Sequence, residues 1–196
     1  LDNEFGGEQK YCYCGNCEHE FQEFLRSRYE GIADLNRRWG NAFWSHDYQR
    51  FEQVKVPLRI DAQLWLKYSP SIELEFMRFG SKTIVEDCRK QASLLRKHTE
   101  RTITTNTDPF FYGDNVNLAD LFRDLDVGGI DVYSTDLYEI GFYSDIVRSA
   151  KSGSFWMMEY GTGSDNLLEE MTQLERMGCE YLHFFKLKPF PWGQEQ

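Results

Sequence analysis

Residues 127–186 decide the fold, because strand patterns alternate with helix patterns along this stretch. Three apolar runs have the length and composition of strands: VGGIDVY (127–133), SFWMME (154–159) and EYLHFFK (180–186). Between them, residues 139–150 and 165–177 are helical in pattern, and Gly178 follows as a C-terminal cap. Strands that alternate with helices predict parallel βαβ units.

The pattern continues toward the beginning of the chain. RTITTN at 101–106 is rich in β-branched residues and predicts a fourth strand. The expected helices cover 18–29, 32–39 (ended by Gly40), 71–97 (with Ser71 as N-cap) and 116–124 (capped by Asn115). Residues 41–57 are an aromatic-rich loop.

Four such strands, with one more just before Leu1, are half of an eight-stranded (β/α)8 TIM barrel, which takes about 250 residues in full. The alternative α/β fold is a doubly wound open sheet, but neither G-x-G-x-x-G nor a P-loop follows any predicted strand. No repeat and no linker-like boundary is visible, so a single domain is expected over residues 1–196. We expect the rest of the barrel to lie upstream in a longer parent chain.

Composition excludes several classes of protein. Hydrophobic residues at 41% and charged residues at 28% are inconsistent with a disordered chain. The net charge of −10 argues against a nucleic-acid or anionic-membrane partner, and no apolar run reaches the ~18 residues of a membrane span. Aromatic residues at 16% suit a site that stacks on sugar rings, or equally a large aromatic core.

Three of the five cysteines are crowded into CYCGNC at 12–17. Thiols spaced C-x-C-x-x-C can converge on one tetrahedral zinc ion, with zinc–sulfur bonds of about 2.3 Å. A structural zinc held by Cys12, Cys14 and Cys17 needs a fourth ligand, for which Cys88, Cys179, His19 and a residue outside this chain are candidates. The alternative is three surface thiols in a loop. The unpaired thiols predict a cytoplasmic location.

Two predicted strand ends carry a carboxylate. Glu4 follows Leu1-Asp2-Asn3, and Glu159 ends the apolar run 155–158. In a TIM barrel, catalysis takes place where strands run into the following loops, and two carboxylates are the minimum apparatus for glycoside hydrolysis. Taken singly, either residue could instead be a solvated surface acid.

The chain resembles glycoside hydrolase family 42, the zinc-containing β-galactosidases built on a TIM barrel. The resemblance rests on LDNEFG (1–6), CYCGNC (12–17), the stretch 21–45 that ends in RWGNAFWS, TTN (104–106), DVYSTDLY (131–138), MMEY (157–160) and WGQEQ (192–196). It implies that the chain covers the end of barrel strand 4 through strand 8, with region 11–57 inserted after strand 4.

The resemblance also implies site roles. Glu4 corresponds to the general acid/base and Glu159 to the nucleophile of a retaining mechanism that cleaves terminal β-D-galactosides. The implied sugar-binding residues are Asn3, at the 2-hydroxyl, and Trp44, Tyr138 and Glu195; Trp44 could equally be a core residue. Cys12, Cys14 and Cys17 correspond to three of four zinc ligands, the fourth lying upstream, and the family is often trimeric.

Two departures from the family pattern bear on the sugar. Leu167 and Thr135 stand where the family often has tryptophan, and each lost aromatic removes stacking of roughly 1 kcal/mol. Galactose preference is therefore less strongly predicted than hydrolysis. The alternatives are another clan-related β-glycosidase, such as a β-glucosidase or arabinosidase, and a non-catalytic sugar-binding barrel.

Overall fold

The computed structural model describes residues 1, 3–5, 11–57, 69–108, 116–161 and 165–185, except for the side chain of Trp44. The chain divides into two compact units: unit 1, Leu1–Glu8 with Ile84–Gln196, and unit 2, Gln9–Thr83. The two units are defined by the contacts that residues make within each of them. The expectation of a single domain over residues 1–196 stays a prediction. None of the helices in the described ranges is long and apolar enough to cross a membrane.

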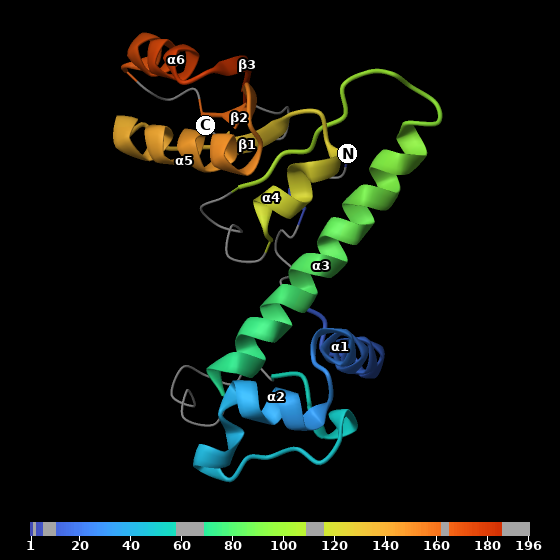
Figure 1. Ribbon diagram of the computed structural model, residues 1–196. Helices are drawn as coiled ribbons and strands as arrows, with labels where there is room; N and C mark the ends of the chain where they lie inside the picture. Colours follow the sequence, from blue (N-terminus) through green and yellow to red (C-terminus); the bar gives the residue numbers. More distant parts are fainter. Residues whose placement is uncertain (2, 6–10, 58–68, 109–115, 162–164, 186–196) are drawn as a thin grey trace, which may run out of the picture. The chain divides into compact units, whose positions relative to one another are not determined.

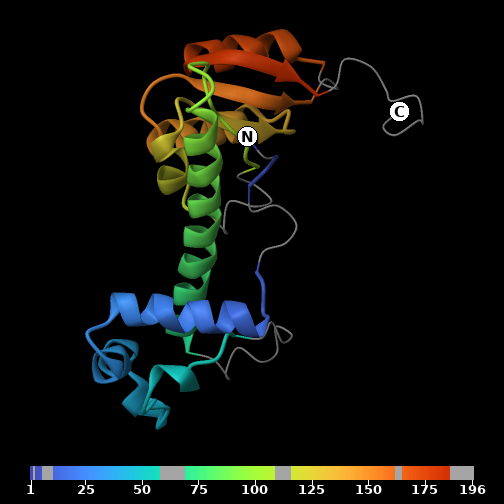
Figure 2. The ribbon, with the colours of Figure 1, turned by 90° about the vertical axis from the view of Figure 1, so that its right-hand side faces the viewer.

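Unit 1 contains a parallel sheet of three strands in the order β1-β2-β3 (Figure 1). The strands are β1 (Gly128–Val132), β2 (Phe155–Tyr160) and β3 (Cys179–Phe184). Helix α5 (Leu137–Ala150) connects β1 to β2, and α6 (Leu167–Arg176) connects β2 to β3. The predicted βαβ units and the α/β class are confirmed for this part of the chain. Figure 2 shows the strands side by side, from a second direction.

Residues 101–106 are not a strand, so this prediction was wrong. The segment does run beside the first strand: Asp126 N donates to Ile103 O at 3.0 Å, and Asp131 N donates to Thr107 O at 2.8 Å. Between these two backbone bonds, a side chain replaces the backbone as donor: Thr104 Oγ1 donates to Val127 O at 2.8 Å. Threonine hydroxyls that bond to nearby backbone compete with a regular ladder, which explains why a β-branched run stays irregular.

Gly129 allows this close approach. A Cβ at this position would lie 2.4 Å from the backbone oxygen of Thr105 and 2.8 Å from Cγ of Met158. No side chain fits between the 103–107 segment and β2 at this point. The glycine in the VGGIDVY pattern therefore has a packing reason.

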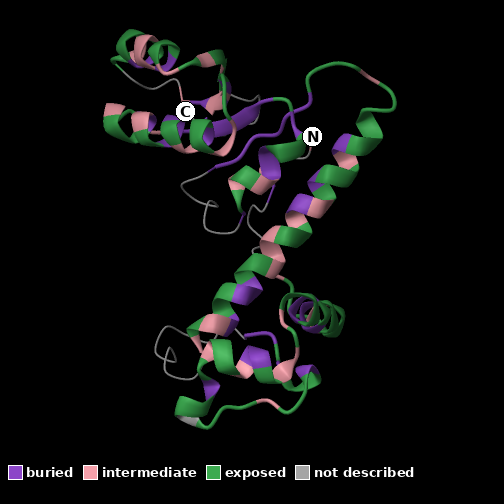
Figure 3. Cartoon of the chain, viewed as in Figure 1, coloured by how far each residue is buried: buried purple, intermediate pink, exposed green. Residues whose placement is uncertain are grey.

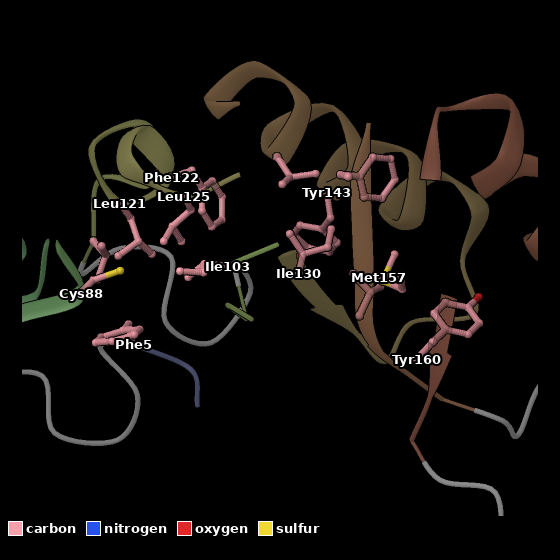
Figure 4. Close-up of a cluster of buried hydrophobic side chains, with 14 of the residues drawn as sticks. Phe5, Cys88, Ile103, Leu121, Phe122, Leu125, Ile130, Tyr143, Met157 and Tyr160 are labelled. Carbon is pink, nitrogen blue, oxygen red and sulfur yellow. The ribbon is translucent and has the colours of Figure 1, made fainter. Parts of the chain in front are cut away.

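The core of unit 1 lies between the sheet, its helices and the second half of α3 (Pro70–Leu95). Figure 4 shows part of it, in which Ile130, Tyr143 and Met157 come from β1, α5 and β2. Every residue of β1 is buried, and the strand is purple along its length in Figure 3. A strand buried on both faces requires that any polar side chain on it be satisfied by its neighbours.

Two helix N-caps differ from the prediction. The helix expected at 116–124 is α4 (Leu118–Leu121) followed by the 3-10 turn η4 (Phe122–Asp124), and its N-cap is Asn117; Asn115 lies outside the described residues. Helix α3 begins at Pro70, and Ser69, not Ser71, precedes it, with its Oγ accepting from Ser71 N at 3.3 Å. Proline is favoured at the first helical position, so the cap lies at Ser69, two positions before the predicted Ser71.

Unit 2 consists of α1 (Gly15–Arg28), α2 (Ile32–Trp39) and the first half of α3, with the 3-10 turns η1 (Asn41–Trp44) and η2 (Phe51–Gln53). Helix α2 ends at Gly40 as predicted, in the left-handed conformation with φ 68°. Its buried cluster contains four aromatic residues, Phe21, Phe24, Phe51 and Phe76, together with aliphatic side chains. Part of the aromatic content therefore forms a core.

Candidate active site

Two carboxylates lie side by side at the carboxyl end of the sheet. Asp131 on β1 and Glu159 on β2 are register partners, and the register shifts just before them on both strands. A bulge redirects side chains locally, and Glu159 as a result departs from the alternation set by buried Phe155 and Met157. Glu159 is thus placed at the edge of the sheet where parallel α/β folds bind their ligands.

Asn106 connects the residues of this edge. Its Nδ2 is 2.8 Å from Asn3 Oδ1, 2.8 Å from Asp131 Oδ2 and 3.4 Å from Glu159 Oε1. Asn106 is buried, and the 103–107 segment that carries it is held on β1 by the bonds described above. One amide thus joins the N-terminal segment to both strand ends.

Glu4 reaches the same place from the N-terminal segment. Leu1 N donates to Thr104 O at 2.9 Å, Glu4 N donates to Asn106 Oδ1 at 3.2 Å, and Phe5 is buried in the unit 1 core. The backbone of Glu4 has φ 43°, in the left-handed region that non-glycine residues seldom adopt. Strain of this kind persists only where surrounding contacts hold it, and it is concentrated at functional sites.

The electrostatics of Glu4 suit an acid that keeps its proton. Burial raises the pKa of its carboxyl, and the negative charges of Glu159 and then Asp108 raise it further. A hydrogen bond with Asp131 acts in the opposite direction on this pKa. Glu4 and Glu159 therefore influence each other directly, as the two carboxyls of a glycosidase must.

Tyr133 holds Glu159 from the other side. The Tyr133 hydroxyl donates to Glu159 Oε2, and its ring packs edge-on against Phe185 with the centroids 6.2 Å apart. Burial, and then the bond to Glu159, raise the pKa of the Tyr133 phenol, which stays protonated as a donor. A donor to each carboxylate oxygen orients Glu159, because Asn106 reaches Oε1.

The structure brings together Asn3, Glu4 and Glu159 among the predicted site residues. Tyr138 lies in the first turn of α5 with its side chain 90% exposed, and the tyrosine hydroxyl that reaches Glu159 is that of Tyr133. Glu195 lies outside the described residues, as does the side chain of Trp44.

Sequence reasoning did not single out three residues of this site, namely Asn106, Asp131 and Tyr133. One signal was available for two of them. Asn106 ends the β-branched run 101–106, and Asp131 is a polar residue near the end of the apolar run 127–133, so both resemble Glu159 in position. Tyr133 has no such signal, because an aromatic residue is ordinary at the end of a strand.

The cysteine cluster is a candidate metal centre of its own in unit 2. The sulfur atoms of Cys12, Cys14 and Cys17 all lie within 4.8 Å of one another. Thiolates that share a tetrahedral zinc ion lie about 3.8 Å apart, so the donor set and spacing fit zinc. Hydrogen bonds from the Cys17 backbone and then the Cys12 thiol lower the pKa of the Cys14 thiol to about 7, toward the thiolate that binds metal.

No candidate fourth ligand lies beside the three cysteines in the part of the chain that the structure describes. Within the described ranges, the group that could hold an ion contains these three cysteines and no further His, Cys, Asp or Glu. Cys88 is buried in the core of unit 1, and Cys179 lies on β3 of that unit.

Comparison with known proteins places this arrangement in a family. The model of glycoside hydrolase family 42, described as β-galactosidase, matches residues 1–193. The chain belongs to glycoside hydrolase family 42. The predicted resemblance is therefore confirmed over nearly the whole chain.

The family 42 relatives are longer proteins. The chain is 32% identical over 187 residues to β-galactosidase BgaA of Clostridium cellulovorans, covering 91% of this chain and 27% of the relative. It is 31% identical over 228 residues to a β-galactosidase of Thermus thermophilus, covering 100% of this chain and 35% of the relative. It thus spans roughly a third or less of the length of these relatives.

The fold agrees with solved family 42 structures. A β-galactosidase from Halorubrum lacusprofundi superposes with a TM-score of 0.86 at 29% identity, covering 100% of this chain and 33% of that chain. The three-stranded parallel sheet with its helices is thus the family 42 arrangement for this part of the protein.

Proposed function

We propose that the protein carrying this chain is a retaining glycoside hydrolase that cleaves terminal β-D-galactosides. One observation carries the proposal: Glu4 and Glu159 are joined through hydrogen bonds of Asn3 and Asn106 at the carboxyl end of a parallel sheet. Membership of a family whose curated relatives are β-galactosidases supports the choice of sugar.

In the proposed mechanism, Glu159 is the nucleophile. Its carboxylate attacks the anomeric carbon and forms a glycosyl-enzyme while Glu4 gives its proton to the leaving oxygen. Glu4 then takes a proton from water as the water oxygen attacks the anomeric carbon and the bond to Glu159 breaks. Glu4 is again protonated and Glu159 is again a carboxylate. The raised pKa of Glu4 supports its role as the proton donor.

The remaining expectations belong to the same proposal. Asn3 hydrogen-bonds the sugar 2-hydroxyl, and Trp44, Tyr138 and Glu195 contact the sugar. The parallel sheet is part of a (β/α)8 barrel that the rest of the protein completes. Cys12, Cys14 and Cys17 hold a structural zinc, which clamps the loop and supplies no step of the reaction.

Two properties concern the whole protein. We extend the proposal to a homotrimer that assembles through the barrel domain and to a cytoplasmic location without a nucleic-acid or membrane partner. Light scattering on the purified full-length protein tests the trimer, and fractionation of the source cells tests the location. A monomer, or recovery outside the cytoplasm, contradicts the respective expectation.

Substitution of the two glutamates in the full-length protein tests the mechanism. Glu159→Gln is expected to abolish turnover of an aryl β-galactoside, because an amide cannot attack the sugar. Glu4→Ala is expected to spare substrates with good leaving groups, which need little acid help, and to slow those with poor ones. Near-normal turnover by Glu159→Gln would exclude the nucleophile role, and equal losses for both leaving groups would exclude the acid role.

A panel of chromogenic β-glycosides tests the sugar. Preference for the galactoside supports the proposal, whereas preference for the glucoside or the arabinoside assigns another glycosidase of the same chemistry. Galactose binding without turnover of any glycoside would indicate a non-catalytic sugar-binding barrel.

A further inference from the structure

A third carboxyl lies inside the site and has no role in the proposed mechanism. Asp131 is 1% exposed, and the neighbouring residues Ile130 and Val132 on β1 belong to the hydrophobic core. Its Oδ2 accepts from Asn106 Nδ2 at 2.8 Å. Its Oδ1 is buried and accepts no hydrogen bond from a described N–H or O–H donor. The hydrogen bond between Asp131 and the Glu4 carboxyl therefore needs a proton on one of the two acids.

The surroundings of Asp131 are unfavourable to a charge. Among the described residues, the charged groups that act most strongly on it are the carboxyls of Glu159, Glu4 and Asp108, and none of these is a cation. The hydroxyl of Tyr133, which follows β1, already donates its hydrogen bond to Glu159. A buried carboxylate among other carboxylates, with one amide donor, is strongly disfavoured relative to the neutral acid.

A cavity of about 220 Å³ adjoins Asp131 and adds a further acidic group. It is lined by Asp108, Asp131, Val132, Tyr133, Ser134, Glu139 and Tyr143. Glu139 and Tyr143 come from α5, so the helix packed beside the strand also contributes a carboxyl and a phenol. Among the described residues that line this cavity, none has a basic side chain that could neutralise an Asp131 anion.

We propose that Asp131 is a positioning residue that remains a neutral carboxylic acid in the resting site and acts through Asn106 and Glu4. In this state it accepts from Asn106 through Oδ2, and its own O–H is a donor to the Glu4 carboxyl. Of the three neighbouring carboxyls, Glu4, Asp131 and Glu159, only that of Glu159 is then negatively charged, as the proposed reaction requires. The inference rests on the proposed function in assigning roles to Glu4 and Glu159, but the protonation of Asp131 can be measured without activity.

The titration of Asp131 agrees with this geometry. Burial, followed by the charge of Glu159, raises the pKa of the Asp131 carboxyl to about 8, and the Asn106 hydrogen bond offsets only part of the rise. At neutral pH the acid form therefore predominates. The charge of Glu4 is among the causes that raise this pKa, so Glu4 loses its proton before Asp131 does, and Asp131 stays neutral while Glu4 titrates.

The pH profile of Asp131→Asn in the full-length protein tests the role. At pH 6 we expect kcat/KM within about fivefold of wild type, because one neutral hydrogen-bonding group replaces another. The basic limb is expected to keep its position, because Asp131 is neutral while Glu4 titrates and the substitution removes no charge. A basic limb that moves to lower pH would show that Asp131 carries a charge that keeps Glu4 protonated. A loss well beyond fivefold at every pH would show a merely structural role, and either result overturns the proposal.

Infrared difference spectroscopy of the same proteins at pH 6.5 tests protonation directly. This pH is ~1 unit or more below the pKa of Asp131, so the acid form predominates. The wild-type minus Asp131→Asn spectrum should contain the carbonyl stretch of a protonated carboxylic acid. Asp145→Asn is the matched control, because Asp145 is an exposed carboxyl on α5 paired with Arg148, and its difference spectrum should lack this band. A missing band for Asp131 overturns the proposal even if the enzyme is active.

A second variant covers the case in which Asp131→Asn fails to fold. Glu4→Gln removes the other protonated carboxyl of the site, so a band that persists in this variant at pH 6.5 and disappears as the pH passes about 8 belongs to Asp131. Loss of the band in Glu4→Gln contradicts the inference. A protein that shows the band but hydrolyses no glycoside would refute the proposed function and leave the buried acid in place.

Discussion

The Tyr160 hydroxyl donates a 2.6 Å hydrogen bond to Glu170 Oε2, and both side chains are buried. Tyr160 directly follows Glu159 at the end of β2, and Glu170 lies on α6. The pair therefore ties the helix to the strand end that presents the proposed nucleophile. Residues that pack against or hydrogen-bond to the support of a reacting group fix its position as well as stabilise the fold.

We expect Tyr160→Phe to destabilise the protein by about 1–3 kcal/mol, because a buried carboxyl loses a donor. Thermal unfolding followed by circular dichroism measures the loss. Tyr181→Phe is the matched control, since Tyr181 is 51% exposed on β3 and should tolerate the change. Equal melting temperatures for the two variants would show that the Glu170 bond contributes nothing.

Gly129→Ala is expected to destabilise by about 1–3 kcal/mol through overpacking, because the new methyl meets backbone as well as side-chain atoms. Gly141→Ala on α5 is the comparison, as its Cβ would come no closer than 3.4 Å to the flexible Gln173 side chain. Alanine in a helix should be neutral or stabilising by up to about 1 kcal/mol. Denaturant unfolding decides, and a harmless Gly129→Ala contradicts the packing argument.

Tyr133→Phe and Tyr138→Phe distinguish which tyrosine serves the site. Loss of the Tyr133 bond to Glu159 should lower kcat/KM by about 10- to 100-fold, the effect of one hydrogen bond to a charged group. Tyr138 contributes only what its predicted contact with the sugar provides, which should appear in KM. A larger fall in kcat for Tyr138→Phe would reverse the assignment made from the Tyr133 contact.

Serine in place of Cys14 or Cys17 should reduce the zinc content of the purified full-length protein, measured by elemental analysis. Removal of a structural metal also lowers the melting temperature, because metal binding contributes to folding. Cys179→Ser is the control, since Cys179 lies on β3 away from the cluster sequence. Unchanged zinc in both cluster variants would refute the site.

Stability should fall with rising pH through the titration of Asp131. Its pKa is 3.8 in an unfolded chain and about 8 in the folded protein, so between these values the folded state holds a proton that the unfolded state releases. The contribution is complete below about pH 4 and decreases by up to about 1.4 kcal/mol per unit as the pH rises to about 8. Asp131→Asn should remove this slope in urea unfolding, whereas the exposed control Asp145→Asn should keep it.

Much of the fold could be predicted because it depends on short-range pattern. Apolar runs at 127–133, 154–159 and 180–186 became β1, β2 and β3, and Gly40 ended its helix where its conformational freedom suggested. The prediction of a strand at 101–106 was wrong because the Thr104 hydroxyl bonds to the backbone of Val127. That acceptor comes close only in the folded chain, so the sequence pattern does not reveal it. The N-caps shifted because several suitable residues stood within a few positions.

The sequence by itself determined the helix–strand alternation, the cysteine spacing and the carboxylates Glu4 and Glu159, since each is a local pattern of residue types. Only the tertiary structure decided that Asn106 joins Asn3, Asp131 and Glu159, and that Tyr133 donates to Glu159. These partners lie from 25 to 103 positions apart in the chain. Burial and the charge of such neighbours set the protonation of Asp131, because the free energy of a charge depends on everything around it in space.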